Sequence, residues 1–284
     1  MVRRLKLQVV VEDTASRRDH RLLAQHGLCL FLEADLGSEK MRLLMDTGAS
    51  ADVTLHNLDL LGIDPEGLDQ IFLSHGHYDH TGGLLGVLGR SKHRIPVLGH
   101  PVAFEPKLKT QPFLKFIGPP FSREEAESSG AVMLLSSDPI PLAPGITTSG
   151  QVDRITSFES VEGFYTVRDG CYLQDNIPDD QSLIVDIEGR GLAVITGCAH
   201  AGVINTILRA KDLTGSDKVY AVLGGFHLLG ASRERIDRTA AELGSLDPEI
   251  IRPGHCTGGQ AAARLQEVLG DRCQPLSTGD LIEL

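Results

Sequence analysis

Three histidines and an aspartate lie within six positions of one segment, and this cluster is the strongest chemical signal in the chain. Residues 74–83 read Ser-His-Gly-His-Tyr-Asp-His-Thr-Gly-Gly and supply His75, His77, Asp79 and His80 directly after an apolar run. Neutral imidazole nitrogens and carboxylate oxygens are ligands that zinc, iron and manganese accept. Because alternate residues of an extended turn point the same way, we expect His75 and His77 to bind one ion. Asp79 and His80 are then expected to bind a second ion beside it.

Histidines also follow three later apolar runs, each in a turn that contains glycine. These turns read Thr196-Gly197-Cys198-Ala199-His200, Gly224-Gly225-Phe226-His227 and Pro253-Gly254-His255-Cys256. The ends of neighbouring strands meet at one edge of a sheet, where α/β proteins place their sites. We therefore expect His200 and His255 to complete the metal ligands. For His227 two roles stay open: support of a ligand histidine, or an acid or base that acts on the substrate.

Asp46 ends another apolar run, in the sequence Leu43-Leu44-Met45-Asp46-Thr47-Gly48. Two interpretations are open for this carboxylate. In the first it caps the helix that is expected to follow. In the second it accepts a hydrogen bond from a ligand histidine and so holds that imidazole in the tautomer that can bind a metal.

Short apolar runs rich in Val, Ile and Leu predict strands, and the segments between several of them predict helices. The expected strands are residues 5–11, 28–32, 42–45, 70–73, 96–98, 132–135, 182–187, 192–195, 219–223 and 249–251. The expected helices are residues 49–61, 202–213, 232–243 and 257–269. Strands dominate the first part of the chain, and strand and helix alternate from residue 182 onward. This order predicts an α/β protein in which helices cover two packed sheets, a four-layer sandwich.

Residues 104–130 differ from the rest of the chain in holding four prolines and four phenylalanines. One interpretation is a surface loop with its own small apolar cluster. The other is a lid over the site, in which Phe113, Phe116 and Phe121 contact a planar substrate. We expect residues 1–284 to form a single domain with this segment as its lid or insertion.

Composition and charge exclude several classes of protein. The 284 residues are 41% hydrophobic and 23% charged, which is typical of a globular protein. No apolar run approaches the roughly 20 residues that a membrane-spanning helix needs. The net charge of −11, without a basic stripe, argues against binding to nucleic acid. Five scattered cysteines predict reduced thiols and a cytoplasmic protein.

The segment 74–83 resembles the metal motif of the metallo-β-lactamase superfamily, and Asp46-Thr47-Gly48 resembles its upstream motif. His26-Gly27-Leu28 and the three later glycine- and histidine-bearing turns are similar to one branch of that superfamily. This branch is named for 7,8-dihydropterin-6-yl-methyl-4-(β-D-ribofuranosyl)aminobenzene 5′-phosphate synthase. The resemblance covers nearly the whole chain. It implies the αβ/βα sandwich of the metallo-β-lactamase fold, in agreement with the layers expected above.

The chain departs from the superfamily pattern at two places. Most hydrolases of the superfamily have a metal-bridging aspartate where this chain has Gly197-Cys198, so either Cys198 takes that place or His200 takes it over. The separate mid-chain histidine that usually serves the first metal has no match, and Asp179-Asp180 lies roughly there. The resemblance still implies two divalent metal ions, with zinc ranked first and iron or manganese as alternatives.

Three functions agree with these residues. The superfamily resemblance implies hydrolysis of a small phosphorylated or ester-like metabolite by a metal-bridging hydroxide, which Asp79 would help to orient. The branch name implies a transferase, in which an aromatic acceptor attacks a pterin methylene carbon and pyrophosphate leaves. A non-catalytic metal-binding protein is the third, although structural zinc sites are usually closed and rich in cysteine. We rank hydrolysis first and expect an anionic small-molecule substrate and no nucleic-acid or membrane partner, with a homo-oligomer as a possible assembly.

Overall fold

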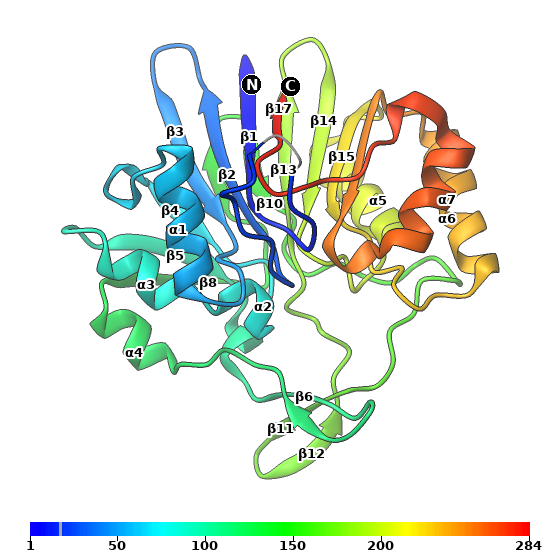
Figure 1. Cartoon of the computed structure of the whole chain (residues 1–284). Helices are drawn as coiled ribbons and strands as arrows, with labels where there is room; N and C mark the ends of the chain where they lie inside the picture. The colour runs from blue at the N-terminus through cyan, green and yellow to red at the C-terminus, as the bar shows by residue number, and fades with distance from the viewer. Residues whose placement is uncertain (17–18) are drawn as a thin grey trace.

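Two β-sheets pack face to face between two layers of helices in the computed structural model, which describes residues 1–16 and 19–284 (Figure 1). Apart from its edge strand β17, the first sheet and its helices come from the first half of the chain, and the second sheet and its helices come mainly from the second half. The predicted α/β fold, a four-layer αβ/βα sandwich, is therefore confirmed.

The first sheet has the strand order β17-β1-β2-β3-β4-β5-β8. Its strands β3, β4, β5 and β8 pair in parallel, whereas β17, β1, β2 and β3 pair antiparallel. The parallel part has its carboxyl ends on one edge, which is the edge that carries the site. The strands are Arg4–Val11 (β1), Cys29–Asp35 (β2), Lys40–Met45 (β3), Gln70–Phe72 (β4), Ile95–Gly99 (β5), Ala131–Leu135 (β8) and Leu281–Glu283 (β17).

The second sheet has the strand order β16-β15-β14-β13-β10-β9. Strands β14, β15 and β16 pair in parallel, and β13 pairs antiparallel with both β14 and β10. The strands are Pro141–Ala143 (β9), Ile146–Thr148 (β10), Ser182–Ile187 (β13), Gly191–Thr196 (β14), Val219–Gly225 (β15) and Ile250–Gly254 (β16).

Helices cover the outer face of each sheet, and their ends follow local sequence signals. The Ser232 hydroxyl accepts the N–H of Arg235 and caps α6, and α1 ends at Gly62, whose φ of 69° is left-handed. The short helix α2 carries two of the predicted metal ligands. The α-helices are Ala51–Leu61 (α1), Tyr78–Thr81 (α2), Leu84–Gly89 (α3), Arg123–Ser128 (α4), Val203–Thr214 (α5), Arg233–Leu246 (α6) and Gly259–Leu269 (α7). The 3₁₀ turns are Pro65–Gly67, Pro101–Phe104, His255–Thr257 and Gly270–Arg272.

A third, smaller sheet protrudes from the sandwich at the bottom of Figure 1. Its strand order is β12-β11-β6-β7, and its strands are Lys107–Lys109 (β6), Lys115–Phe116 (β7), Phe164–Arg168 (β11) and Cys171–Gln174 (β12). The unusual segment 104–130 is therefore divided: its first part forms two strands of this sheet, and its later part returns to the helical layer as α4. A capping box between Ser122 and Glu125 starts that helix.

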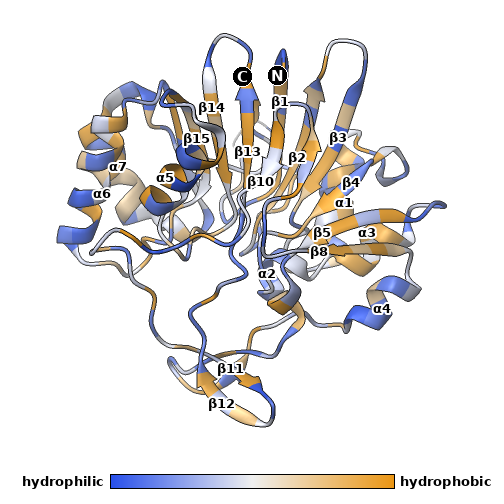
Figure 2. Cartoon of the chain, turned by 180° about the vertical axis from the view of Figure 1, so that it is seen from behind, coloured by the Kyte–Doolittle hydropathy of each residue, from blue (hydrophilic) through white to orange (hydrophobic). Residues whose placement is uncertain are grey.

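The apolar core lies in three layers that follow the sandwich. One cluster fills the space between the two sheets and includes Leu7, Phe72 and Ile195, all fully buried. Two further clusters lie between each sheet and its helices, and a small fourth cluster contains Ile117, Val161, Phe164 and Ile177. Figure 2 shows the matching pattern, with hydrophobic residues along the strands and a largely hydrophilic α4 at the outside. The layered burial holds the strand ends, and hence the site, in a fixed frame.

All ten predicted strands and all four predicted helices are present, with boundaries that shift by a few residues. Helix α7 begins two residues later than expected, at Gly259, because residues 255–257 form a tight 3₁₀ turn that presents His255. The sequence interpretation missed the short elements, among them α3, α4 and the strands of the third sheet. Among residues 1–16 and 19–284, every helix is too short or too polar to cross a lipid bilayer.

Candidate metal centre

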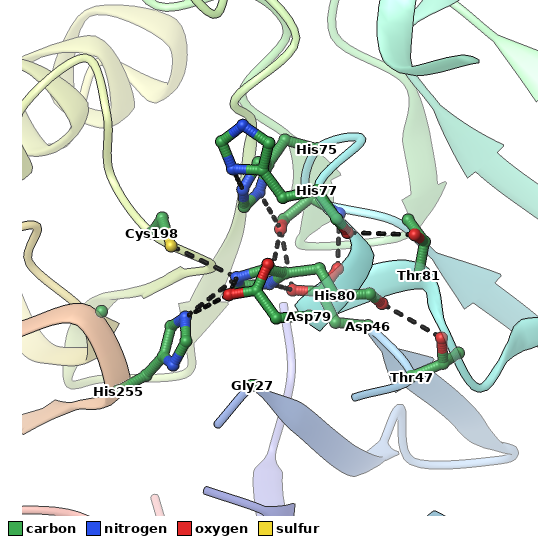
Figure 3. A network of polar contacts seen from close by, with 12 residues as sticks. Gly27, Asp46, Thr47, His75, His77, Asp79, His80, Thr81, Cys198 and His255 are labelled. Atoms are coloured by element: carbon green, nitrogen blue, oxygen red, sulfur yellow. Dashed lines mark hydrogen bonds and ion pairs between the residues drawn. The ribbon is translucent and has the colours of Figure 1, made fainter. Parts of the chain in front are cut away.

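The predicted site residues meet where strands of both sheets end (Figure 3). Asp46 follows β3, the segment 74–80 follows β4, and the late turns follow β14 and β16. These strands run parallel to a neighbour in their sheet, so their carboxyl ends gather on one edge. All of the predicted ligands are buried, namely His75, His77, Asp79, His80, His200 and His255.

His80, His255 and Asp79 direct three donor atoms toward one point (Figure 3). Nε2 of His80 lies 3.1 Å from Nε2 of His255, and Oδ2 of Asp79 lies 3.3 Å from the same His255 nitrogen. Nδ1 of His80 donates to Asp46 and Nδ1 of His255 donates to Asp13, each at 2.7 Å. Because an ionised carboxylate only accepts hydrogen bonds, each neutral imidazole keeps its proton on Nδ1. When both imidazoles are neutral, their Nε2 atoms present lone pairs beside the Asp79 carboxylate, and a cation between these three atoms would satisfy all of them.

His75, His77 and His200 form another convergent group. Nε2 of His75 lies 2.9 Å from Nδ1 of His77 and 3.3 Å from Nε2 of His200. The Ser74 hydroxyl donates to Asp46 at 2.7 Å, so its oxygen accepts from Nδ1 of His75 at 3.0 Å. In the neutral imidazole of His75, the second nitrogen, Nε2, therefore carries a free lone pair, as Nε2 of His80 does. This group is a set of three nitrogen donors.

Burial and neighbouring charges favour the metal-binding protonation state in four of these groups, His75, His77, His200 and Asp79. Burial lowers the pKa of His75 and of His200 well below the usual value, and it lowers the pKa of His77 to about 3. Burial alone would raise the pKa of Asp79, but His80 and His255 hold it well below its ordinary range. Neutral imidazoles and an ionised carboxylate are the forms that bind divalent ions. His255 differs: burial alone would lower its pKa, but hydrogen bonds to Asp13 and Asp79 raise the pKa well above its usual value, so an ion bound there must displace a proton.

The spacing of the donor atoms also fits a divalent cation. Atoms at about 2.1 Å from a tetrahedral ion lie about 3.4 Å from one another. The five separations that join His75 to His77 and to His200, and His80, His255 and Asp79 to one another, run from 2.9 to 3.9 Å. Small shifts of the side chains would bring each group onto an ion. The described residues can therefore hold metal at this edge of the sandwich.

Asp46 supports the ligands of both groups and does not cap a helix. Its carboxylate accepts the backbone N–H and the hydroxyl of Ser74 and Nδ1 of His80, all at 2.7 Å. The residue before α1 is Ser50, so the capping interpretation of Asp46 is wrong. Asp46 has a φ of 60°, an unfavourable conformation for a residue with a side chain. Such strain is found where a side chain must be aimed.

The sequence interpretation missed a carboxylate and an imidazole from the beginning of the chain. Oδ1 of Asp13 accepts from His255, and its Oδ2 accepts from Nδ1 of His26 at 2.9 Å. Nε2 of His26 lies 3.3 Å from Oδ2 of Asp79, and Glu12 accepts the backbone N–H of His255 at 2.6 Å. These partners are up to 243 positions apart in sequence. The only signal for this region was His26-Gly27-Leu28, which resembles the synthase branch.

A buried ion-pair cluster positions the loop between His75 and His77. Nζ of Lys107 lies 2.6 Å from Oδ1 of Asp179 and 3.0 Å from Oδ2 of Asp175. Oδ2 of Asp179 accepts the N–H of Gly76 at 2.8 Å. A Cβ at position 76 would collide with the backbone carbonyl of Ala103, so only glycine fits there. The cluster links the third sheet to the predicted metal ligands.

Asp180, the neighbour of Asp179, does not join the convergent donors. Its Oδ1 lies 3.9 Å from Nδ1 of His75, on the side away from the donor group, and its Oδ2 accepts the N–H of Ala201 at 3.4 Å. Burial raises the pKa of Asp180 to about 7.

Cys198 and His227 border the two donor groups. Sγ of Cys198 lies 3.2 Å from Nε2 of His80. The His227 ring centroid lies 4.2 Å from that of His200, and its φ is 47°. His227 therefore touches a predicted ligand and also borders the pocket described next, so the structure is compatible with both roles left open for it.

A pocket of about 290 Å³ opens above the donors. Phe164 of β11 forms one wall and stacks on His77 with 5.4 Å between ring centroids. Its lining combines aromatic and aliphatic side chains with charged ones, and it includes Tyr78, Ile117, Phe164, Leu229, Lys109, Lys115 and Glu162. A larger cavity of about 340 Å³ near Lys6 and Arg42 lies away from every donor group. The smaller pocket is therefore the one placed for chemistry.

The three phenylalanines expected to contact a substrate do not line this pocket. Phe113 and Phe116 are 67% and 55% exposed on the third sheet. Phe121 packs into the apolar cluster beneath α4 with Ala126. The expectation for these residues is not supported, because their strand and loop turn them outward or into the core. Phe164, which the sequence did not single out, stands at the predicted position.

Comparison with known proteins agrees with this fold. The family model of the metallo-β-lactamase superfamily matches residues 26–160. Over 98% of its length the chain is also 35% identical to a curated protein of the synthase branch identified from the sequence. The chain belongs to the metallo-β-lactamase superfamily.

That relative is the 7,8-dihydropterin-6-methyl-4-(β-D-ribofuranosyl)-aminobenzene-5′-phosphate synthase of Methanocaldococcus jannaschii, and 96% of it is covered. An uncharacterized protein of the same organism is 33% identical over 92% of this chain and 94% of its own length. Among solved structures, Tm1679, a metal-dependent hydrolase of the β-lactamase superfamily, aligns with a TM-score of 0.83 and 26% identity over 99% of both chains. The zinc-bound PqqB of Methylobacterium extorquens shares the fold, with a TM-score of 0.54 and 12% identity over 98% of this chain and 100% of that one.

Proposed function

We propose that this chain is a metal-dependent transferase that joins an aminobenzene acceptor to a dihydropterin carried on a diphosphate ester. The observation that carries the proposal is the aromatic and cationic pocket directly above the metal donors. The name of the 35% identical relative supports the same reaction class. The proposal places transfer ahead of hydrolysis, and so reverses the order expected from the superfamily resemblance alone.

Two divalent cations, zinc first, fit the two donor groups. His75, His77 and His200 would hold one ion, and Asp79, His80 and His255 would hold the other. Bound there, the ions would supply positive charge that stabilises the oxygens of a leaving diphosphate. Asp46 and Asp13 keep the ligand imidazoles in the tautomer that binds metal.

The walls of the pocket suit a planar ring that carries an anion. Phe164 and Tyr78 offer aromatic surface to a pterin or benzene ring. Lys109 and Lys115, which belong to the third sheet, add positive charge at the pocket for phosphate groups. The third sheet thus takes the part of the lid that was expected from residues 104–130. An anionic small molecule is the substrate class that these side chains favour.

The transfer step forms one bond and breaks one bond. The amine nitrogen of the acceptor bonds to the methylene carbon of the pterin, and the bond from that carbon to the diphosphate oxygen breaks. The amine proton then passes to a base, for which we assign the imidazole of His227 at the pocket wall. Lys109 and Lys115 hold the phosphate groups, and Phe164 aligns the ring.

Hydrolysis of a small phosphorylated or ester-like metabolite is the second candidate. The pocket volume of about 290 Å³ is at the lower end of ligand sites, which suits one small substrate better than two. The structural neighbour Tm1679 is described as a metal-dependent hydrolase. In this reaction water would take the place of the amine, and Asp79 would help to orient it.

One assay separates the candidates. The metal-loaded protein is incubated with 6-hydroxymethyl-7,8-dihydropterin diphosphate, with and without 4-(β-D-ribofuranosyl)aminobenzene 5′-phosphate, and diphosphate release is measured. A transferase releases diphosphate at least about tenfold faster with the acceptor and forms the coupled product. Equal release without the acceptor would identify a hydrolase and overturn the proposal. His77→Ala serves as the control, and absence of release in every arm, with phosphate esters also intact, would favour a non-catalytic metal protein.

A further inference from the structure

We propose that the thiolate of Cys198 is a direct metal ligand placed between the two donor groups, so that the centre binds through nitrogen, oxygen and sulfur. The inference rests on the metal centre of the proposed function but not on the reaction. Sγ of Cys198 is within 4.8 Å of donor atoms of His75 and His80, and likewise of His200 and His227. The same sulfur atom is therefore within reach of an ion bound at His80 and of an ion bound at His200.

The loop that carries Cys198 packs closely against the metal motif because two of its neighbouring positions are glycines without a side chain. A Cβ at Gly197 would overlap the side chain of Ser74, the residue that accepts from His75. A Cβ at Gly225 would lie 3.1 Å from Cα of Cys198. Glycine at both positions lets the turn after β14 approach β4 and β15 closely. The backbone of Cys198 therefore cannot move away from the centre without opening this packing.

The distance between the sulfur and its nearest imidazole suits a shared ion. With zinc–sulfur and zinc–nitrogen bonds of about 2.3 and 2.05 Å, tetrahedral ligands lie about 3.5 Å apart. Sγ of Cys198 lies 3.2 Å from Nε2 of His80, so a small shift places both on one ion. Nε2 of His80 carries a lone pair because the proton of this imidazole is on Nδ1, which donates to Asp46 (Figure 3). The thiol and the imidazole thus face each other as a metal-binding pair.

Cys256 provides a matched comparison in the same pocket. Both sulfurs are buried and both line the pocket, and Cys256 belongs to one group of possible donors, with Cys198 and His255. The thiol of Cys256 donates to the backbone carbonyl of Cys198 at 3.3 Å, so its proton already has a partner. Cys198 instead points its sulfur toward His80. We therefore assign the metal ligand to Cys198, whose sulfur faces a predicted ligand imidazole, and not to Cys256.

A sulfur ligand predicts which metals the centre prefers. Thiolates favour zinc and other soft or borderline ions, whereas carboxylate-rich sites favour magnesium and manganese. Replacing the superfamily's usual bridging carboxylate by sulfur therefore shifts the preference toward zinc, cobalt and iron. Cys198→Asp, which restores a carboxylate, should bind manganese relatively better than the unchanged protein does.

X-ray absorption spectroscopy of the zinc-loaded full chain tests the assignment. We expect a sulfur shell at about 2.3 Å beside the nitrogen and oxygen shell at about 2.0–2.1 Å. Cys198→Ser should lose the sulfur shell and weaken zinc binding by at least about tenfold, and Cys256→Ser should keep both. In the cobalt-loaded protein the thiolate-to-metal absorption in the near ultraviolet should follow the same pattern.

The outcomes separate this inference from the proposed reaction. Absence of sulfur from the zinc shell of the unchanged protein, or its retention in Cys198→Ser, would overturn the ligand assignment whatever the activity. If Cys198→Ser fails to fold, the spectrum of the unchanged protein together with that of Cys256→Ser still decides. A sulfur shell in a protein without transferase activity would contradict the proposed function but would still support Cys198 as a metal ligand.

Discussion

Replacing Lys107 by methionine should destabilise the protein and weaken metal binding together. The ammonium group of Lys107 is buried between Asp175 and Asp179, and its removal leaves two carboxylates without their cation. Loss of one partner of a buried ion pair costs about 3–5 kcal/mol. That is a large part of the roughly 5–15 kcal/mol by which proteins of ordinary size are stable.

The effect on metal follows from the second role of Asp179. Its Oδ2 accepts the N–H of Gly76, between the predicted ligands His75 and His77. Without Lys107 the carboxylate is free to take up a proton or to turn, and the loop between the two ligands loses an anchor. Loss of such supporting contacts typically lowers metal affinity about 10–100-fold. We expect that range for zinc in Lys107→Met.

Urea unfolding of the chelator-treated protein, followed by circular dichroism, measures the first effect, and competition with a zinc-binding dye measures the second. Lys109→Met is the control, since Lys109 lies two residues away on the same strand and has no buried ion pair. A triple variant with Lys107→Met, Asp175→Asn and Asp179→Asn should recover part of the stability, because no uncompensated charge remains. If Lys107→Met unfolds at the same urea concentration as the control, the reasoning about this cluster is wrong.

Three further results are expected. His77→Ala should lose metal and activity together while its circular dichroism spectrum is kept, and full metal content by elemental analysis would exclude a ligand role for His77. Lys109→Ala combined with Lys115→Ala should raise KM for a phosphorylated substrate about tenfold or more with little change in kcat, and an unchanged KM would remove these lysines from substrate binding. Burial holds the pKa of His77 at about 3 in the folded protein, against about 6.5 in an unfolded chain. Below pH 6.5 the unfolded chain therefore binds a proton that the folded chain does not. The metal-free protein should lose up to about 1.4 kcal/mol of stability per pH unit down to pH 3 from this group. Urea midpoints measured across that range should fall less steeply for His77→Gln, and equal slopes would contradict the assignment.

Much of the architecture was readable from local patterns. The apolar runs at 5–11, 182–187 and 219–223 are strands in the structure. They could be predicted because a strand that is buried on one or both faces consists largely of Val, Ile and Leu, and this pattern is visible in the local sequence alone. The histidine motif at 74–80 was recognisable because its residue types are rare and closely spaced. Short elements such as β7, with two residues, left no comparable pattern, because they are defined by pairing with β6 and not by their own sequence.

The sequence by itself determined which residues could bind metal, since the chemistry of imidazole, thiol and carboxylate does not depend on the fold. Only the tertiary structure decided how they are grouped: that His200 joins His75 and His77, that Cys198 faces His80, and that Asp46 supports ligands. It also placed Phe164 at the pocket in the position expected for Phe113, Phe116 or Phe121. The physical reason is that these contacts join strand ends far apart in the chain, and their distances are set by sheet packing rather than by sequence spacing.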